Sequence, residues 1–153
     1  MKIVDFVRPE LVMPDLAATA KVDVIDELAG HLAAHVPGLD HATLVRALKE
    51  RERLASTAID QGVAIPHAKL RALPHLVGLV GRKLDGVDFD SMDGRPTHLF
   101  FVLIAPENST GVHLKALARI SRLFREPGFR QHLLTAPDAA SIFRVIADED
   151  AKY

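Results

Sequence analysis

The segment from 57 to 69, which reads TAIDQGVAIPHAK, contains a histidine in a setting that suits nucleophilic chemistry. The apolar residues 63–65 are typical of a strand, and Pro66 tends to end a strand because its nitrogen has no hydrogen to donate. His67 would then lie at a strand end, on backbone stiffened by the proline, with the small Ala68 beside it. A neutral imidazole nitrogen can act as a nucleophile near neutral pH. A packed or capping histidine is the alternative that this pattern leaves open.

A second histidine, His113, follows Thr110 by three residues and falls in the first turn of a predicted helix. The start of a helix offers unpaired backbone N–H groups and a partial positive charge, and both favour a bound phosphoryl oxygen. His113 also belongs to the inward-facing stripe of this helix, which continues through Leu117, Ile120 and Phe124. A purely structural role in the core is therefore the alternative to a role in phosphate binding.

Three further side chains could bind an anionic group that is transferred to His67, such as a phosphoryl group. Arg51 precedes His67 by sixteen residues, and its guanidinium could bridge two phosphoryl oxygens and neutralise their charge. An arginine at a helix C-terminus also interacts favourably with the helix dipole, and this structural role is the alternative for Arg51. Thr57 and Lys69 are weaker candidates, because a hydroxyl and an ammonium near His67 could contact either phosphate or solvent.

Other motifs give little support to other chemistry. His31 and His35 are spaced by four residues on a predicted helix and could hold a transition metal, but the sequence offers no evident third ligand. A metal enzyme that uses His67 and His113 would lack a carboxylate in motif spacing. The sequence contains no Walker loop and no Gly-x-Ser-x-Gly motif, so nucleotide use and serine hydrolysis are not indicated.

The first half of the chain alternates strand and helix signals. Residues 11–13 predict a short strand. Thr19 can cap a helix that runs to about residue 35, and Asp40 can cap a second helix that ends close to Arg51. The second helix therefore delivers Arg51 just before the extended segment that leads to His67.

The second half contains the most apolar segment of the protein, residues 99–105. Its seven apolar residues show no alternation, which predicts a strand buried on both faces and helices on both sides of the sheet. Thr110 can cap the helix that follows. The fold class is therefore α/β, with one sheet sandwiched by helices. The remaining predicted elements are a strand at 76–80, turns at Asp85–Gly86 and Asp93–Gly94, and helices at 129–134 and 139–146.

Length and composition predict one globular domain over residues 1–153. The net charge is −1, so no overall basicity indicates a nucleic-acid or membrane partner. Cysteine is absent, which excludes disulfides and thiolate sites. No apolar run is long enough to cross a bilayer, and Asp5 comes too early for a signal peptide. We expect a cytoplasmic protein.

The segment around His67 resembles the phosphorylation signature of the mannitol/fructose-type IIA proteins of the bacterial phosphotransferase system, and in particular the stand-alone nitrogen-related IIA proteins. The resemblance covers nearly the whole chain. It is carried by residues 3–6, Arg51–Glu52, Ile59, residues 63–68, Phe89–Asp90, Asp93–Gly94 and residues 113–115.

The resemblance implies a fold, a site and partners. The fold would be the mannitol-type IIA fold, with a single mixed sheet between helices. His67 would be the phosphohistidine, modified at Nε2, with His113 as the second active-site histidine and Arg51 beside them. The donor would be a histidine-phosphorylated carrier of the HPr type, so that neither a cofactor nor a metal is needed at this site. Such a protein is a phosphohistidine carrier rather than an independent enzyme.

The resemblance leaves two biological roles open. A regulator would hold the phosphoryl group as a signal to partners such as a potassium transporter or a sensor kinase. A sugar-transport component would pass it to a IIB-type domain. The resemblance of residues 1–150 favours the regulator.

One residue departs from the family pattern. Asp60 stands where relatives usually have glycine or alanine, and it adds a negative charge to the segment that leads to His67. A binding module that has lost phosphorylation is therefore a third interpretation.

Overall fold

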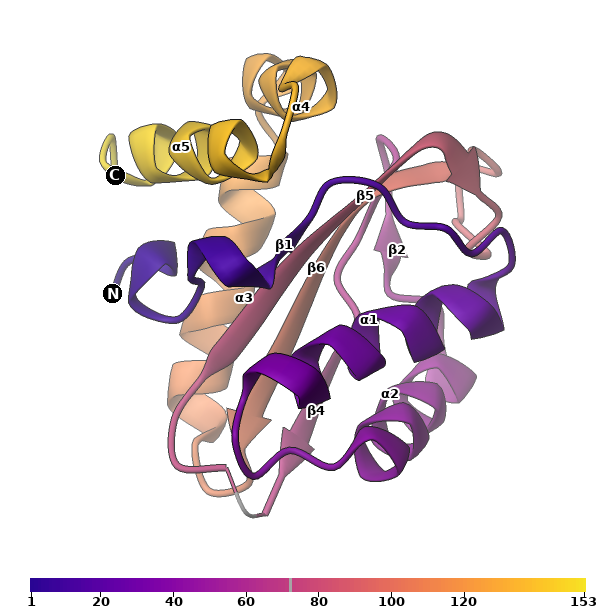
Figure 1. Ribbon diagram of the computed structural model, residues 1–153, viewed down its shortest axis with the longest axis vertical. Coiled ribbons are helices and arrows are strands. Elements are labelled where there is room, and N and C mark those ends of the chain that lie inside the picture. The colour runs from indigo at the N-terminus through magenta and orange to yellow at the C-terminus, as the bar shows by residue number, and fades with distance from the viewer. Residues whose placement is uncertain (72) are drawn as a thin grey trace.

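The computed structural model describes residues 1–71 and 73–153, and this part of the chain forms one mixed sheet between layers of helices (Figure 1). The strands are β1 (Val12–Met13), β2 (Ala58–Ile59), β3 (Val63–Ala64), β4 (His67–Leu70), β5 (Val77–Val87) and β6 (Thr97–Pro106). The helices are α1 (Lys21–His35), α2 (His41–Leu54), α3 (Thr110–Phe124), α4 (Pro127–Thr135) and α5 (Ala139–Asp150), with short 3-10 turns at Ile3–Asp5 and Pro9–Leu11.

Strand β6 is the centre of the sheet. It pairs antiparallel with β5 on one side and parallel with both β3 and β4 on the other. Leu99, Phe101 and Leu103 belong to the core on one face of the sheet, while the alternate residues of β6 belong to the core on the other face. The prediction of a strand buried on both faces is confirmed, and so is the α/β fold with one mixed sheet sandwiched by helices.

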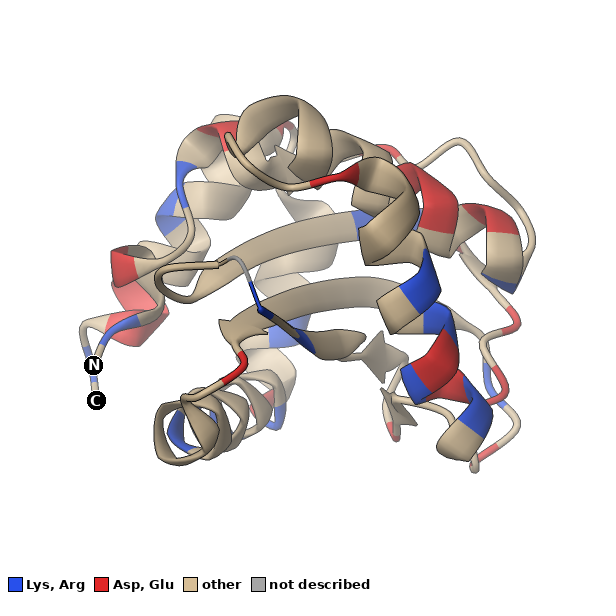
Figure 2. Cartoon of the chain, turned by 90° about the horizontal axis from the view of Figure 1, so that it is seen from below, with Lys and Arg blue, Asp and Glu red and all other residues tan. Residues whose placement is uncertain are grey.

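Different parts of the chain form the two helical layers. The amphipathic helices α1 and α2 cover the face of the sheet nearest the viewer in Figure 1, and α3 covers the opposite face. Helices α4 and α5 close the top of the second layer and bring the two termini together. Lys2 Nζ donates to the carbonyl oxygen of Tyr153 at 2.8 Å. The strands carry few charged residues, whereas α2 is densely charged (Figure 2). None of the helices in the described chain has the length and apolar character needed to span a bilayer.

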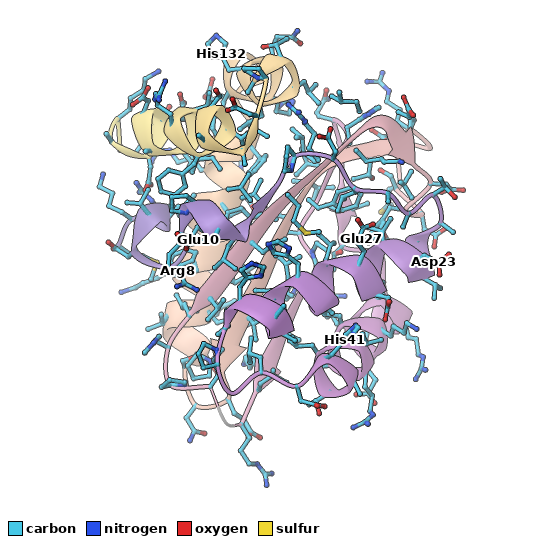
Figure 3. The ribbon with its side chains drawn as sticks, viewed as in Figure 1. Arg8, Glu10, Asp23, Glu27, His41 and His132 are labelled. Carbon is cyan, nitrogen blue, oxygen red and sulfur yellow. The ribbon has the colours of Figure 1, made fainter. Side chains whose placement is uncertain are left out.

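Local signals predicted some helix ends correctly and others not. The carboxylate of Asp40 accepts the N–H of Thr43 at 2.9 Å, which confirms it as the cap of α2. Thr19 does not cap α1, because the helix begins one residue later with Ala20 as N-cap. The carboxylate of Glu27, on the second turn of α1, accepts the N–H groups of Ala17 and Ala18, which precede the helix and its N-cap (Figure 3). Thr110 is the first residue of α3, after the N-cap Ser109.

The predicted turn at Asp85–Gly86 is wrong. Both residues lie within the long strand β5, which has an irregularity in its pairing between Arg82 and Val87. Gly86 absorbs this irregularity with φ +81, and a Cβ there would stand 2.8 Å from side-chain atoms of His98. The predicted turn at Asp93–Gly94 is confirmed by the bond from the Gly94 N–H to the Ser91 carbonyl at 3.0 Å.

Candidate functional site

His67 is the first residue of β4, next to the central strand. The strand predicted to end at Pro66 is interrupted rather than ended, since β3 and β4 both pair in parallel with β6. Pro66 has no N–H to donate, but its carbonyl accepts the N–H of Leu103 at 3.0 Å, so β6 remains paired across the interruption. The sheet therefore holds His67 in a fixed register opposite Leu103.

Two hydrogen bonds determine the tautomer of His67. Nδ1 lies 2.7 Å from the carbonyl oxygen of Ile65, so Nδ1 must carry the proton for that bond to form. On the other side of the ring, Nε of Arg51 donates to Nε2 at 3.2 Å, which requires a lone pair on Nε2. The two contacts agree on a neutral ring with its proton on Nδ1 and its nucleophilic lone pair on Nε2.

The surroundings keep His67 uncharged. Burial lowers the pKa of His67 below its usual value, and the positive charge of Arg51 acts in the same direction. The Ile65 carbonyl and the carboxylate of Glu52 oppose this shift without reversing it. The Nε2 lone pair of His67 is therefore available at neutral pH.

His113 faces His67 from the first turn of α3. The two rings meet edge to face, with their centroids 5.5 Å apart and their planes at 75°. His113 is 6% exposed, and its Nε2 is buried without a hydrogen-bond partner among the described residues. Burial, together with the neighbouring His67 and Lys69, lowers the pKa of His113 to about 4. It is thus a neutral, buried and unpaired polar group that faces the nucleophile.

An open groove gives access to these two rings. Lys69 lies at its edge and donates from Nζ to Oγ1 of Thr110 at 3.0 Å, next to the start of α3. Arg51 is anchored there by a bond from Nη1 to the carbonyl of Ala55 at 2.9 Å. The structure therefore brings four of the five predicted site residues together. The groove is lined by Ala47, Glu50, Arg51, Leu54, His67, Ala68, Lys69 and His113.

Thr57 is the predicted residue that lies elsewhere. It is 5% exposed, and both its N–H and its hydroxyl donate to the carboxylate of Glu52. Glu52 in turn forms an ion pair with Lys21 on α1 at 3.0 Å. Reasoning from the sequence used Glu52 only as part of the family pattern and did not single out Lys21, since the apolar stripe of α2 does not show which residues of α1 its other side chains meet.

Asp60 lies at the tip of the β2–β3 hairpin. It is exposed, and the left-handed backbone angles of this turn fall on Gln61 and Gly62, at φ 72 and 75. Along β6 the partners of Val63 and His67 are four residues apart, so the tip lies more than about 13 Å from His67. The negative charge of Asp60 is therefore remote from the groove.

The His31–His35 pair stacks on the surface of α1, with ring centroids 4.1 Å apart. Nε2 of His31 contacts the carbonyl of Glu10 at 2.8 Å, and Nδ1 of His35 contacts the carbonyl of His31 at 2.9 Å. Within residues 1–71 and 73–153, no three histidine, aspartate or glutamate side chains are grouped so as to hold a metal ion.

The sequence matches a known family over almost its whole length. Residues 5–149 match the family model of the phosphoenolpyruvate-dependent sugar phosphotransferase system, EIIA 2. A nitrogen regulatory protein of Bradyrhizobium diazoefficiens is 43% identical, over 96% of this chain and 95% of that protein. The fructose-specific EIIABC component of Bacillus subtilis is 35% identical over 98% of this chain, which corresponds to 24% of that larger protein.

Solved structures agree with this assignment. The nitrogen regulatory protein IIA-Ntr of Neisseria meningitidis has a TM-score of 0.88 and 31% identity, and the match covers 94% of this chain and 98% of that chain. The fold is also shared with IIA mannitol of Escherichia coli, with a TM-score of 0.76 at 17% identity over 91% of this chain and 97% of that chain. This chain belongs to the EIIA type 2 family of the phosphotransferase system, and its similarity to IIA-Ntr proteins extends over the whole fold.

Proposed function

We propose that residues 1–153 form one EIIA domain that carries a phosphoryl group on Nε2 of His67. The donor is a histidine-phosphorylated carrier protein of the HPr type, which is itself charged from phosphoenolpyruvate by enzyme I. The observation that carries this proposal is the pair of hydrogen bonds on His67, because they leave Nε2 as the unprotonated nitrogen, with its electron pair at the groove. The fold similarity to IIA mannitol of Escherichia coli, whose structure is also known in a complex with phosphorylated IIB mannitol, is consistent with it.

The transfer is a substitution at phosphorus. The Nε2 electron pair of His67 forms a bond to phosphorus, the N–P bond of the donor breaks, and its electron pair stays on the donor imidazole. The proton on Nδ1 of His67 remains on the bond to the Ile65 carbonyl, so the modified ring becomes positively charged and offsets part of the phosphoryl charge. Because the energy of the N–P bond is conserved between two imidazoles, the protein needs only to position and neutralise the groups.

The groove supplies three kinds of stabilisation. Arg51 must release Nε2 as the phosphoryl group arrives, and its anchor on the Ala55 carbonyl keeps the guanidinium close enough to turn to the phosphoryl oxygens. His113 gains a partner for its unpaired Nε2 in the same oxygens. Lys69 and the N-terminus of α3 add positive potential at the edge of the groove.

The direct test is mass spectrometry of the intact protein after incubation with phosphoenolpyruvate, enzyme I and an HPr-type carrier. We expect one acid-labile phosphoryl group in the wild type and none in His67→Ala. His132→Ala is the matched control, because His132 is an exposed histidine on α4 at the opposite end of the molecule (Figure 3). Phosphorylation that persists in His67→Ala would refute the assignment of His67.

The regulatory role is the version of this function that we favour. The relative at 43% identity is a nitrogen regulatory protein that aligns over 95% of its length. A regulator of this kind would act by binding a protein such as a potassium transporter or a sensor kinase in one phosphorylation state. To separate the two roles, the phosphorylated chain is mixed with IIB domains of the fructose and mannitol types. A sugar-transport component would lose its phosphoryl group to one of them, whereas a regulator would retain it.

We do not favour the interpretation that this protein is a binding module that has lost phosphorylation. That interpretation rests on the negative charge of Asp60, and Asp60 lies at the hairpin tip, remote from His67. The charged groups that act on the pKa of His67 are Arg51 and Glu52.

A further inference from the structure

Two neighbouring residues in the last turn of α2 act on opposite sides of the His67 ring. Arg51 contacts Nε2 directly. Glu52 is connected to the other ring nitrogen, Nδ1, by hydrogen bonds that pass through the main chain at Thr57 and Ile65. Because consecutive residues of a helix point in directions about 100° apart, one turn of α2 can serve both sides.

The connection from Glu52 to His67 is a continuous set of short hydrogen bonds. The Glu52 carboxylate accepts the N–H of Thr57 at 3.0 Å and also its hydroxyl. The carbonyl of Thr57 accepts the N–H of Ile65 at 3.0 Å. The carbonyl of Ile65 accepts the Nδ1–H of His67 at 2.7 Å. The Ile65–Pro66 peptide has little freedom to turn away, because a residue before proline is confined to extended backbone angles.

The carboxylate that begins this chain is buried and paired. The Glu52 side chain is 6% exposed, and Lys21 Nζ lies 3.0 Å from it. Lys21 is held in place in turn by Asp90, at 3.3 Å, and by the ring of Phe89, whose centroid is 4.7 Å from Nζ. These partners hold the buried carboxylate of Glu52 in one orientation, so the carboxylate can fix the position of Thr57.

We propose that Glu52, held by Lys21, is a positioning residue that fixes the Nδ1–H tautomer of His67 through Thr57 and Ile65. The proposal rests on the proposed function, since its benefit is a lone pair on Nε2 at the moment of phosphoryl transfer. Glu52 is not among the residues that line the His67 groove, and its side chain is 6% exposed, so it offers little surface to the phosphoryl group or to the donor protein. Its effect on transfer is therefore exerted through His67 alone.

A purely structural role for Glu52 is the competing explanation. Glu52 ties the end of α2 to the following segment, and its loss would then lower stability without changing the ring of His67. The two explanations differ in the state of the imidazole, which is measurable without any donor protein. Nitrogen-15 NMR distinguishes the Nδ1–H from the Nε2–H tautomer of each histidine and follows the pKa of His67.

The experiment compares the unphosphorylated wild type with Glu52→Ala, Glu52→Gln and Lys21→Met, and uses Glu126→Ala as a control. Glu126 is an exposed glutamate at the start of α4, and its side chain accepts no hydrogen bond in the described structure. We expect Glu52→Ala to populate the Nε2–H tautomer of His67. The rate of phosphorylation at saturating donor should fall about five- to tenfold, the equivalent of about one lost hydrogen bond. The donor concentration for half-maximal rate should stay unchanged, because Glu52 lies outside the groove.

The conservative variant separates position from charge. Glu52→Gln keeps an acceptor oxygen for the Thr57 N–H, so it should retain more of the Nδ1–H tautomer than Glu52→Ala. Its His67 pKa should fall, because the negative charge that raises it is gone. Lys21→Met should shift the tautomer in the same direction by a smaller amount. If Glu52→Ala does not fold, the comparison of Glu52→Gln and Lys21→Met with Glu126→Ala decides the question in the same way.

The outcomes separate this proposal from the proposed function. A wild-type tautomer and a wild-type saturated rate in the folded Glu52 variants would overturn the positioning role while leaving His67 as the acceptor. A changed tautomer in Glu52→Ala would support the positioning role even where wild type accepts no phosphoryl group, and in that case the proposed function fails instead.

Discussion

Replacement of Arg51 by methionine tests the charge stabilisation on which phosphoryl transfer depends. In the resting protein Arg51 donates from Nε to Nε2 of His67 at 3.2 Å and from Nη1 to the carbonyl of Ala55 at 2.9 Å. Arginine has five N–H donors, so the anchor on Ala55 leaves four that can reach phosphoryl oxygens. Methionine keeps much of the side-chain volume and removes all of them.

The expected magnitude follows from these contacts. A hydrogen bond to a charged group contributes about 1.5–3 kcal/mol, and because the groove is open we take this range for all the phosphoryl contacts of Arg51 together. A loss of about 1.5–3 kcal/mol corresponds to a rate of transfer lower by about 10- to 160-fold. The same substitution should raise the pKa of His67, because Arg51 contributes to lowering it.

Quenched-flow mass spectrometry with a phosphorylated HPr-type donor measures the rate, and nitrogen-15 NMR measures the pKa. Arg51→Lys retains the charge without the planar fork and should fall between wild type and Arg51→Met. Arg53→Met is the matched control, since Arg53 is an exposed arginine in the same turn that does not line the His67 groove. A transfer rate in Arg51→Met within twofold of that of Arg53→Met would refute this reasoning.

Three other perturbations test separate parts of the structure. The pKa of His113 is lowered to about 4 in the folded protein, so the unfolded chain binds a proton at this histidine more readily than the folded protein does. The stability that depends on its neutral form is fully present above about pH 6.5 and is lost as the pH falls toward about 4. The denaturation midpoint of His113→Gln should therefore depend less on pH in this window than that of wild type, and equal slopes would contradict the buried neutral state. Asp60→Gly should leave the rate of His67 phosphorylation within about twofold of wild type by the same mass assay, since Asp60 lies at a remote hairpin tip; a large gain would restore the inhibitory role of its charge. Arg82 is 3% exposed and donates to three main-chain carbonyls, so Arg82→Met should lower the free energy of unfolding by about 2–5 kcal/mol in urea titrations, and a change below about 1 kcal/mol would show that these bonds contribute little.

The sequence by itself determined the central strand and the nucleophile candidate. A run of seven apolar residues at 99–105 can be satisfied only by burial on both faces, and that requirement alone placed helices on both sides of a sheet. The apolar segment before Pro66 likewise marked His67 as a histidine beside a proline-restricted strand. These signals are local, because burial pattern and proline geometry act within a few residues.

Two of the local predictions are wrong. Asp85–Gly86 is a strong turn signal in isolation, but pairing of β5 with β6 on both sides of the irregularity keeps it within a strand. Thr19 is a good N-cap by type, yet α1 begins one residue further on, with Ala20 in the N-cap position and no side-chain cap bond. At Asp85–Gly86, tertiary strand pairing outweighed a local preference of about 1 kcal/mol.

Only the tertiary structure decided how the site is assembled. Parallel pairing of β4 with β6 places His67 opposite Leu103, and α3 follows the end of β6, so His113 meets His67 across forty-six residues of sequence. The packing of α2 against α1 decided that Glu52 faces Lys21 and that Thr57 faces Glu52 rather than the groove. The apolar stripe of a helix predicts which face is buried, but the partners of its other side chains depend on which residues of the neighbouring helix lie opposite them in space.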